Sequence, residues 1–88
     1  MTITFDLEFT DTFAGEANYC WVKRGQITVP PGTSDPRIKR LAKAELGLTG
    51  VPGRWTDFGG DFYEFRPYRS CTVMFVTYRD KGIDHENA

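Results

Sequence analysis

Hydrophobic and polar residues alternate strictly at residues 2–10, and this alternation predicts a strand. The apolar positions are Ile3, Phe5, Leu7 and Phe9, and the polar positions are Thr4, Asp6, Glu8 and Thr10. A period of two is typical of a strand with one face in the core and one in water. Turn-forming residues at 11–16 end the pattern. A second strand is predicted at residues 18–29, where Gly25 indicates a bulge or sharp bend. The two strands together predict an N-terminal hairpin.

A helical period follows the two prolines at residues 30–31. Ser34 and Asp35 precede Pro36, and this order predicts a capping side chain followed by proline in the first turn. The helix is predicted at residues 36–46 and ends at Gly47, with Leu48 placed to close over the last turn. The apolar stripe consists of Ile38, Leu41, Ala42 and Leu46, and the opposite arc consists of Arg37, Lys39, Arg40 and Lys43. The pattern predicts a buried stripe and a basic outer face.

Three further strands are predicted in the second half of the chain. Residues 54–58 and 61–66 form a hairpin pattern around a Gly-Gly dipeptide at 59–60, which suits a two-residue turn with positive φ. The stretch 63–78 ends in a strand that is apolar on both alternating faces. Cys71, Val73 and Phe75 occupy one face, and Met74 and Val76 occupy the other. We therefore expect this strand at the centre of the sheet, with the remaining elements packed around it.

The order of these elements is β-β-α-β-β-β, which predicts an α+β fold with one helix packed on a mostly antiparallel sheet. A chain of 88 residues has room for one core. Seven Phe, four Tyr and two Trp supply large apolar surface for that core. We expect a single domain at residues 1–79 and a flexible C-terminal tail at residues 80–88, where the sequence is polar and aperiodic.

The charge balance and the cysteines narrow the class of protein. A net charge of −1 argues against a protein whose main role is to coat nucleic acid. Cys20 and Cys71 lie in apolar, strand-like runs, so we expect two buried thiols in a reducing compartment. They could form a disulfide only if their strands are neighbours. The first residues lack the pattern of a signal peptide, and no apolar run approaches the roughly 20 residues that span a bilayer. These features predict a cytoplasmic protein.

Groups that could carry out catalysis are sparse. Nucleophilic catalysis by Ser or Cys requires a base beside the nucleophile, but the single histidine, His85, lies in the predicted tail. Residues 84–86 in that tail are expected to be solvated rather than to hold a metal. Asp57 and Asp61 flank the predicted turn, where acidic residues are common, and with Glu64 they are candidates for paired-carboxylate chemistry. We expect no catalytic residue, no metal and no cofactor, and therefore no enzyme.

Charged residues are segregated along the chain. Residues 1–16 carry four acidic residues and no Lys or Arg, and the acidic residues are Asp6, Glu8, Asp11 and Glu16. The predicted helix carries the four basic residues Arg37, Lys39, Arg40 and Lys43. Exposed strands and helices also carry charge for solubility alone. A small body with two oppositely charged flanks nevertheless suits docking onto a larger partner, and acidic residues on a rigid strand can occupy a groove built to bind phosphates.

Three stretches of the chain resemble small proteins encoded by bacteriophages and integrated elements of bacteria. They are residues 9–22 (FTDTFAGEANYCWV), residues 46–51 (LGLTGV) and residues 71–77 (CTVMFVT). That group includes anti-CRISPR proteins, which are similar in size, cytoplasmic and usually without catalytic residues. The resemblance implies a protein that binds a CRISPR effector complex so that target DNA cannot engage.

The leading hypothesis is a non-enzymatic inhibitor of a host protein or ribonucleoprotein effector complex, with the acidic residues or the basic helix making the contact. The alternative is a small nucleic-acid-binding accessory protein that uses the basic helix and exposed aromatic residues. The aromatic and basic run at residues 62–69 is typical of surfaces that stack single-stranded bases, and it is equally typical of a strand whose rings lie in the core. A third class, a small enzyme, would depend on Asp57, Asp61 or Glu64.

Overall fold

The computed structural model of the chain describes residues 2–59 and 62–79. The elements are β1 (Ile3–Phe13), β2 (Glu16–Val29), α1 (Asp35–Glu45), β3 (Gly53–Asp57), β4 (Phe62–Pro67) and β5 (Thr72–Tyr78). This order confirms the predicted α+β fold. The predicted tail at residues 80–88 and the second half of the predicted turn, Gly60 and Asp61, lie outside the described residues.

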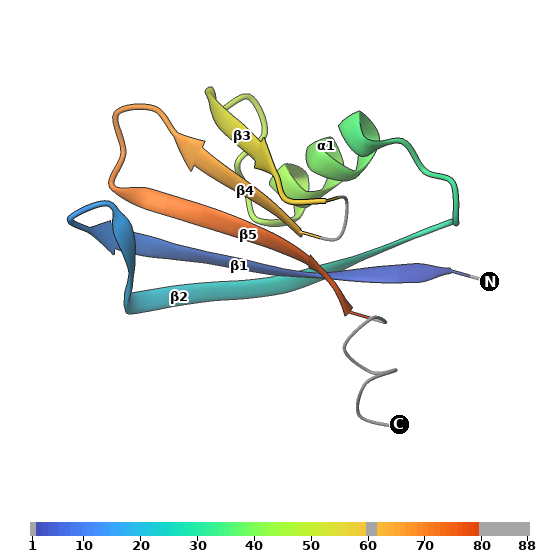
Figure 1. The fold of residues 1–88 in the computed structure, drawn as a ribbon, viewed down its shortest axis with the longest axis horizontal. Helices are drawn as coiled ribbons and strands as arrows, with labels where there is room; N and C mark the ends of the chain where they lie inside the picture. Colours follow the sequence, from blue (N-terminus) through green and yellow to red (C-terminus); the bar gives the residue numbers. More distant parts are fainter. Residues whose placement is uncertain (1, 60–61, 80–88) are drawn as a thin grey trace.

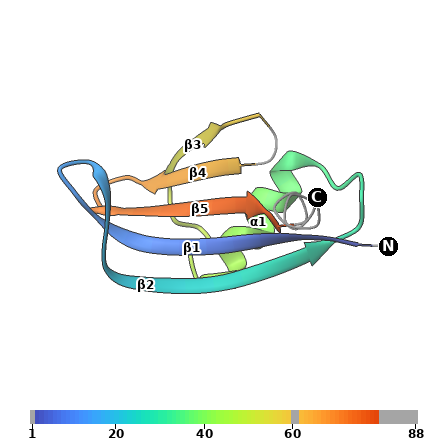
Figure 2. The ribbon, with the colours of Figure 1, turned by 60° about the horizontal axis from the view of Figure 1, so that its bottom comes forward.

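The strands form one sheet in the order β2-β1-β5-β4-β3 (Figure 2). Every pair of neighbours is antiparallel. Strand β5 therefore lies in the middle, as its apolar pattern predicts. The N-terminal hairpin supplies one side of the sheet, and the β3–β4 hairpin supplies the other.

Helix α1 packs against one side of this sheet (Figure 1). Its stripe residues Ile38, Ala42 and Leu46 are buried, as predicted. The sheet residues of the same core are Phe5, Leu7, Ile27, Val29, Tyr63, Phe65, Met74 and Val76. Full burial of one such aliphatic or aromatic side chain contributes roughly 1.5–3 kcal/mol. The helix has 11 residues, and no helix in the described ranges is long and apolar enough to cross a membrane.

The two ends of α1 are held differently. Ser34 has the extended conformation of a capping residue, but its side chain makes no capping hydrogen bond, so that part of the prediction is wrong. At the other end Gly47 has a φ of +76°, and the Leu48 amide donates a 2.7 Å hydrogen bond to the Lys43 carbonyl. Leu48 is buried beneath the last turn. The predicted helix end is therefore confirmed, and the left-handed conformation of Gly47 lets the chain fold back over the last turn.

Gly25 does not mark a bulge, in contrast to the prediction. It pairs with Leu7 in a regular part of the ladder, and the irregularity lies further along, between Thr10 and Thr12 of β1. A β-carbon at Gly25 would stand 3.3 Å from the Glu45 Cγ atom and 3.4 Å from the Leu46 Cδ2 atom. The missing side chain at Gly25 therefore lets the end of α1 approach β2 closely.

Cys20 and Cys71 are exposed free thiols, so the prediction of buried thiols is wrong. Cys20 lies on β2 and Cys71 immediately precedes β5, and β1 separates these two strands in the sheet. The Thr12 amide of β1 donates a 2.8 Å hydrogen bond to the Cys71 carbonyl. The apolar run predicts a strand correctly at Cys20, whereas Cys71 lies one residue before β5, and the run does not report that either side chain is exposed.

Candidate functional site: the open face of the sheet

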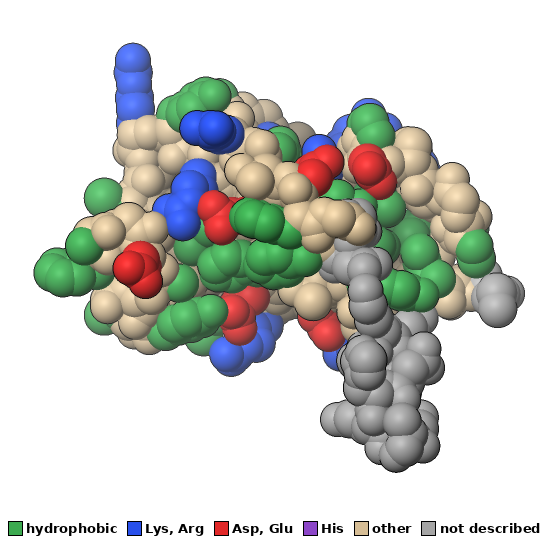
Figure 3. Space-filling model, in the orientation of Figure 1, with side chains coloured by type: hydrophobic (Ala, Val, Ile, Leu, Met, Phe, Trp, Pro, Cys, Tyr) green, Lys and Arg blue, Asp and Glu red, His purple; other side chains and the backbone are tan. Residues whose placement is uncertain are grey.

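The side of the sheet opposite α1 is called the open face. Because alternate residues of a strand point to opposite sides, the neighbours of the buried core residues project here. Its side chains include Thr4, Asp6 and Glu8 of β1, Arg24 and Gln26 of β2, Phe75 and Thr77 of β5, and Phe62, Glu64 and Arg66 of β4. Figure 3 shows a band of hydrophobic side chains across this part of the surface, flanked by acidic and basic groups.

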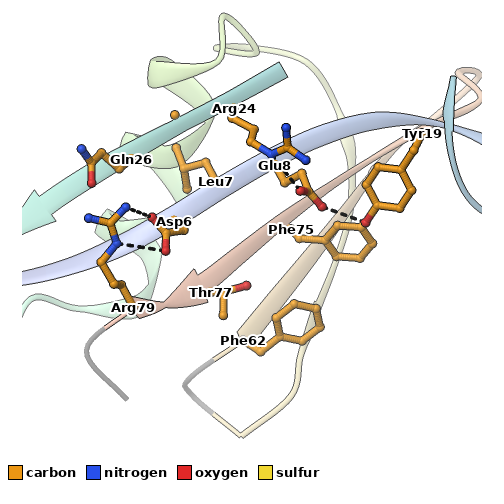
Figure 4. A pocket seen from close by; sticks show the side chains of 11 residues that line it. Asp6, Leu7, Glu8, Tyr19, Arg24, Gln26, Phe62, Phe75, Thr77 and Arg79 are labelled. Atoms are coloured by element: carbon orange, nitrogen blue, oxygen red, sulfur yellow. Dashed lines mark hydrogen bonds and ion pairs between the residues drawn. The ribbon is translucent and has the colours of Figure 1, made fainter. Parts of the chain in front are cut away.

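A hollow of about 790 Å³ lies in the open face (Figure 4). It is lined by the aromatic rings of Tyr19, Phe62 and Phe75 together with Asp6, Leu7, Glu8, Arg24, Gly25, Gln26, Thr77 and Arg79. The rings of Phe62 and Phe75 stack with centroids 5.7 Å apart, and Phe58 adds a further ring 5.3 Å from Phe62. We call this the sheet hollow. Phe75 is half-buried and Thr77 of the same face of β5 is exposed, whereas Val73 of that face is fully buried.

Two ion pairs flank the rings of the sheet hollow. The Arg79 guanidinium holds Asp6 through both carboxylate oxygens, at 2.8 Å and 3.1 Å. The Arg24 Nε atom lies 3.2 Å from a Glu8 carboxylate oxygen. Exposed pairs of this kind contribute little to the free energy of unfolding. Their main effect is to hold the charged groups in place and to leave the lining of the hollow without net charge.

Tyr19 reaches the sheet hollow from a strained backbone position. Its φ is +55°, which is rare for an aromatic residue and costs on the order of 1–3 kcal/mol. The Tyr19 amide donates a 3.1 Å hydrogen bond to the Thr10 hydroxyl, and the phenol donates a 2.7 Å hydrogen bond to Glu8. Thr10 is fully buried and donates to the Trp21 carbonyl at 2.7 Å. These contacts hold the Tyr19 ring over the open face.

The backbone of Tyr19 belongs to a wide bulge in β2. Thr10 pairs with Val22 and Thr12 pairs with Ala17, so Asp11 alone stands opposite residues 18–21. The Asp11 carboxylate accepts hydrogen bonds from the Asn18 side chain at 2.9 Å and from the Cys20 amide at 2.8 Å. The hydrogen bond from Asn18, with smaller effects from backbone amides, holds the pKa of Asp11 below its usual value. Asp11 therefore organises the bulge.

The four acidic residues predicted as a contact surface are thus separated by the structure. Asp6 and Glu8 line the sheet hollow, Asp11 lies in the bulge, and Glu16 is exposed at the start of β2. Sequence reasoning missed Tyr19, Arg24 and Arg79 as parts of the site. The strict alternation of β1 placed Asp6 and Glu8 on one face, but no local signal named the arginines that pair with them.

The four basic residues of α1 are also divided. Arg37 and Arg40 are exposed. The Lys39 ammonium lies 3.0 Å from an Asp57 carboxylate oxygen, and the Lys43 ammonium donates a 2.6 Å hydrogen bond to the Val51 carbonyl. The predicted basic outer face therefore exists at two positions, whereas the two lysines lie against the sheet and the loop that follows the helix.

The remaining candidate groups show no assembled arrangement in the described part of the chain. Asp57 pairs with Lys39 and Glu64 pairs with Arg66, while Asp61 and residues 84–86 lie outside that part. No group of three or more His, Cys, Asp or Glu residues that could hold a metal occurs among the described residues. Comparison of the chain with protein-family models, with curated proteins and with solved structures finds no match. The geometry of the open face is therefore the basis for a functional proposal.

Proposed function

We propose that this protein is a non-enzymatic inhibitor that binds a host nucleic-acid-targeting complex through its open face, in the manner of anti-CRISPR proteins. The observation that carries the proposal is the sheet hollow, in which aromatic rings are flanked by arginine–carboxylate pairs. Protein interfaces have this composition, since they are enriched in aromatic residues and Arg at the centre and are polar at the rim. The open face is thus suited to a protein partner.

The charge of the open face favours a protein over a nucleic acid. Asp6 and Glu8 line the sheet hollow, and Glu64 lies on the same face. A nucleic-acid strand crossing this face would bring its phosphates close to these carboxylates, which would oppose the attraction to the arginines. A protein surface can present cations to the carboxylates and anions to the arginines at once.

The hydrogen bonds around Tyr19 support the same proposal. The ring is held at both its amide and its phenol, so little side-chain freedom is left for binding to remove. Binding to an ordered surface loses less conformational entropy than binding to a mobile one. The backbone strain at Tyr19 is also typical of functional positions, where surrounding contacts hold an unfavourable conformation.

The inhibitory role follows from the resemblance to small phage and mobile-element proteins. In this proposal the protein works in the cytoplasm of a bacterial host and covers a surface that the effector complex uses for target DNA. Asp6 and Glu8 would then meet basic residues that otherwise bind phosphates. No cofactor takes part in such an inhibition.

The proposal is tested by affinity capture from a lysate of the bacterial host, read by mass spectrometry. The test variant is Asp6→Lys/Glu8→Lys, and the matched control is Glu16→Lys, which reverses a charge on the same flank but outside the sheet hollow. We expect the control to capture the same effector complex as the wild type and the test variant to lose it. Equal capture by all three proteins, with unchanged circular dichroism, would show that the open face is not the contact.

The basic residues of α1 support the alternative function, a small nucleic-acid-binding accessory protein. A gel shift with DNA alone, repeated at increasing salt, separates the two candidates. Phosphate contacts release counterions, so binding through Arg37 and Arg40 would weaken steeply as salt rises. The inhibitor is expected to show no shift with double-stranded DNA alone.

A further inference from the structure

A second hollow, of about 400 Å³, lies between α1 and β3 on the helix side of the sheet. We call it the basic groove, and it is lined by Pro36, Lys39, Arg40, Lys43, Thr49, Gly50 and Trp55. Lys39, Arg40 and Lys43 follow Pro36 by three, four and seven positions, so the four residues share one face of α1. Trp55 lies across from them on β3. A hollow of this volume is large enough to hold a small ligand.

The charge of the basic groove has one sign. Its lining carries three cations, Lys39, Arg40 and Lys43, and no carboxylate. Asp57 lies outside the lining and offsets only Lys39, at 3.0 Å. The groove therefore keeps an excess of positive charge, which is matched by a phosphate monoester with its charge of about −1.5 to −2 at neutral pH.

The lysines of the basic groove are fixed before any ligand arrives. Lys43 donates to the Val51 carbonyl at 2.6 Å, and its ammonium lies 4.7 Å from the centre of the Phe65 ring. Lys39 lies 5.4 Å from the centre of the Trp55 ring. Each ammonium has three donors, so these contacts leave donors for an anion. Fixed cations lose less side-chain entropy on binding an anion than mobile ones do.

Trp55 supplies the apolar side of the groove. The indole packs on Phe65 with a centroid distance of 4.9 Å, which holds its orientation. It is only half-buried, and it lines the groove together with Pro36. Bases pack well on aromatic side chains, so the Trp55 ring can contact a planar base. Arg and Lys both bind phosphate oxygens, so Arg40 and Lys43 can bind the phosphate of the same ligand.

We infer that the basic groove binds a nucleoside phosphate, with the base against Trp55 and the phosphate on Arg40 and Lys43. This site is separate from the open face, so the inference does not depend on the proposed function. The chemistry is shared by a free nucleotide and by one nucleotide of a single strand. Arg37 lies on α1 but outside the groove, which gives a control with the same charge on the same helix.

The test is a fluorescence titration in a Trp21→Phe background, where Trp55 is the remaining tryptophan of the two in the chain. The probes are the four ribonucleoside monophosphates, adenosine, inorganic phosphate and a short single-stranded oligonucleotide. We expect at least one monophosphate to change the Trp55 emission and to bind about tenfold more tightly than either adenosine or phosphate, since two sets of contacts act together. An oligonucleotide that binds more tightly than every monophosphate would identify the strand as the source, and equal binding would identify the free nucleotide.

The matched variants are Arg40→Glu and Arg37→Glu. Arg40→Glu is expected to weaken monophosphate binding about tenfold or more, because it replaces a charged donor by an anion, while Arg37→Glu leaves it within about twofold because distant exposed charges are screened. Arg40→Gln provides a second, milder loss at the same position. The inference is overturned if no monophosphate binds, if inorganic phosphate binds as tightly as the nucleotides, or if Arg37→Glu weakens binding as much as Arg40→Glu.

Discussion

The phenol of Tyr19 donates a 2.7 Å hydrogen bond to Glu8, the residue that also pairs with Arg24. This contact joins the bulge of β2 to the middle of β1. The bond holds an aromatic ring above the open face although the backbone of Tyr19 has a positive φ. Glu8 therefore links a strained segment, a charged rim and the sheet hollow.

We expect this contact to make the free energy of unfolding change with pH in the alkaline range. The hydrogen bond to Glu8, together with smaller effects of burial and of the nearby carboxylate charge, raises the pKa of Tyr19 above its ordinary value of 10.0. The protonated phenol is thus favoured in the folded state. Its contribution to the free energy of unfolding is complete below pH 10 and is lost as pH rises through the pKa of the folded state. Thermal unfolding is measured from about pH 8 to 11. Tyr19→Phe should remove the part of the pH dependence of the unfolding temperature that comes from this phenol.

Tyr68→Phe is the control for this prediction. Tyr68 is 60% exposed, and its hydroxyl makes no hydrogen bond within the described residues. The variant should follow the alkaline profile of the wild type. A Tyr19→Phe profile that also matches the wild type would contradict the prediction.

Asp11 is expected to make the free energy of unfolding depend on pH in acid, with the opposite sign. The pKa of Asp11 lies below its ordinary value of 3.8, chiefly because Asn18 donates to the carboxylate. The ionised form is favoured in the folded state. Its contribution to the free energy of unfolding is present above pH 3.8 and is lost as pH falls through the pKa of the folded state. Asp11→Asn should unfold more easily than the wild type at neutral pH. As the pH falls below 3.8, it should lose less additional free energy of unfolding than the wild type, and urea unfolding at a series of pH values measures this difference. Glu16→Gln is the control, because Glu16 lies outside the bulge, and it should follow the acid profile of the wild type. If Asp11→Asn also followed the wild-type profile, the bulge would not depend on the Asp11 carboxylate.

Two glycines should respond differently to the same substitution. A β-carbon at Gly53 would lie 2.6 Å from the Arg66 carbonyl oxygen and 2.6 Å from a carbon of the Phe65 ring. Because backbone and a buried ring cannot move aside easily, Gly53→Ala should cost about 1–3 kcal/mol of unfolding free energy. Gly25→Ala meets the flexible Glu45 side chain at 3.3 Å and the Leu46 side chain at 3.4 Å, the latter an ordinary contact, so the cost should stay below about 1 kcal/mol. Equal costs in urea unfolding would contradict this distinction.

The thiols of Cys20 and Cys71 should both react in the folded protein. Both side chains are exposed and free. A chromogenic thiol reagent added without denaturant is expected to modify both cysteines, to the same extent as in the unfolded chain. Cys20→Ser and Cys71→Ser should each remove half of the signal. Protection of either thiol until unfolding would contradict the exposed placement.

Local pattern predicted most of the fold. The alternation of β1, the apolar stripe of α1, its end at Gly47 and the central position of β5 follow from spacing that can be read within a few residues. Steric and hydrogen-bonding preferences of neighbouring residues decide these features, so they are present in the sequence before any long-range contact forms.

The candidate site was decided by the tertiary structure. Asp6 pairs with Arg79 across 73 positions of the chain, and Glu8 pairs with Arg24 only because the hairpin register brings them together. The bulge around Asp11, misassigned to Gly25 from the sequence, also depends on partners from the opposite strand. Periodicity by itself determined which side chains share a face. Only the folded sheet decided which face the helix leaves open and which charges meet there, because those contacts depend on strand order and register rather than on local spacing.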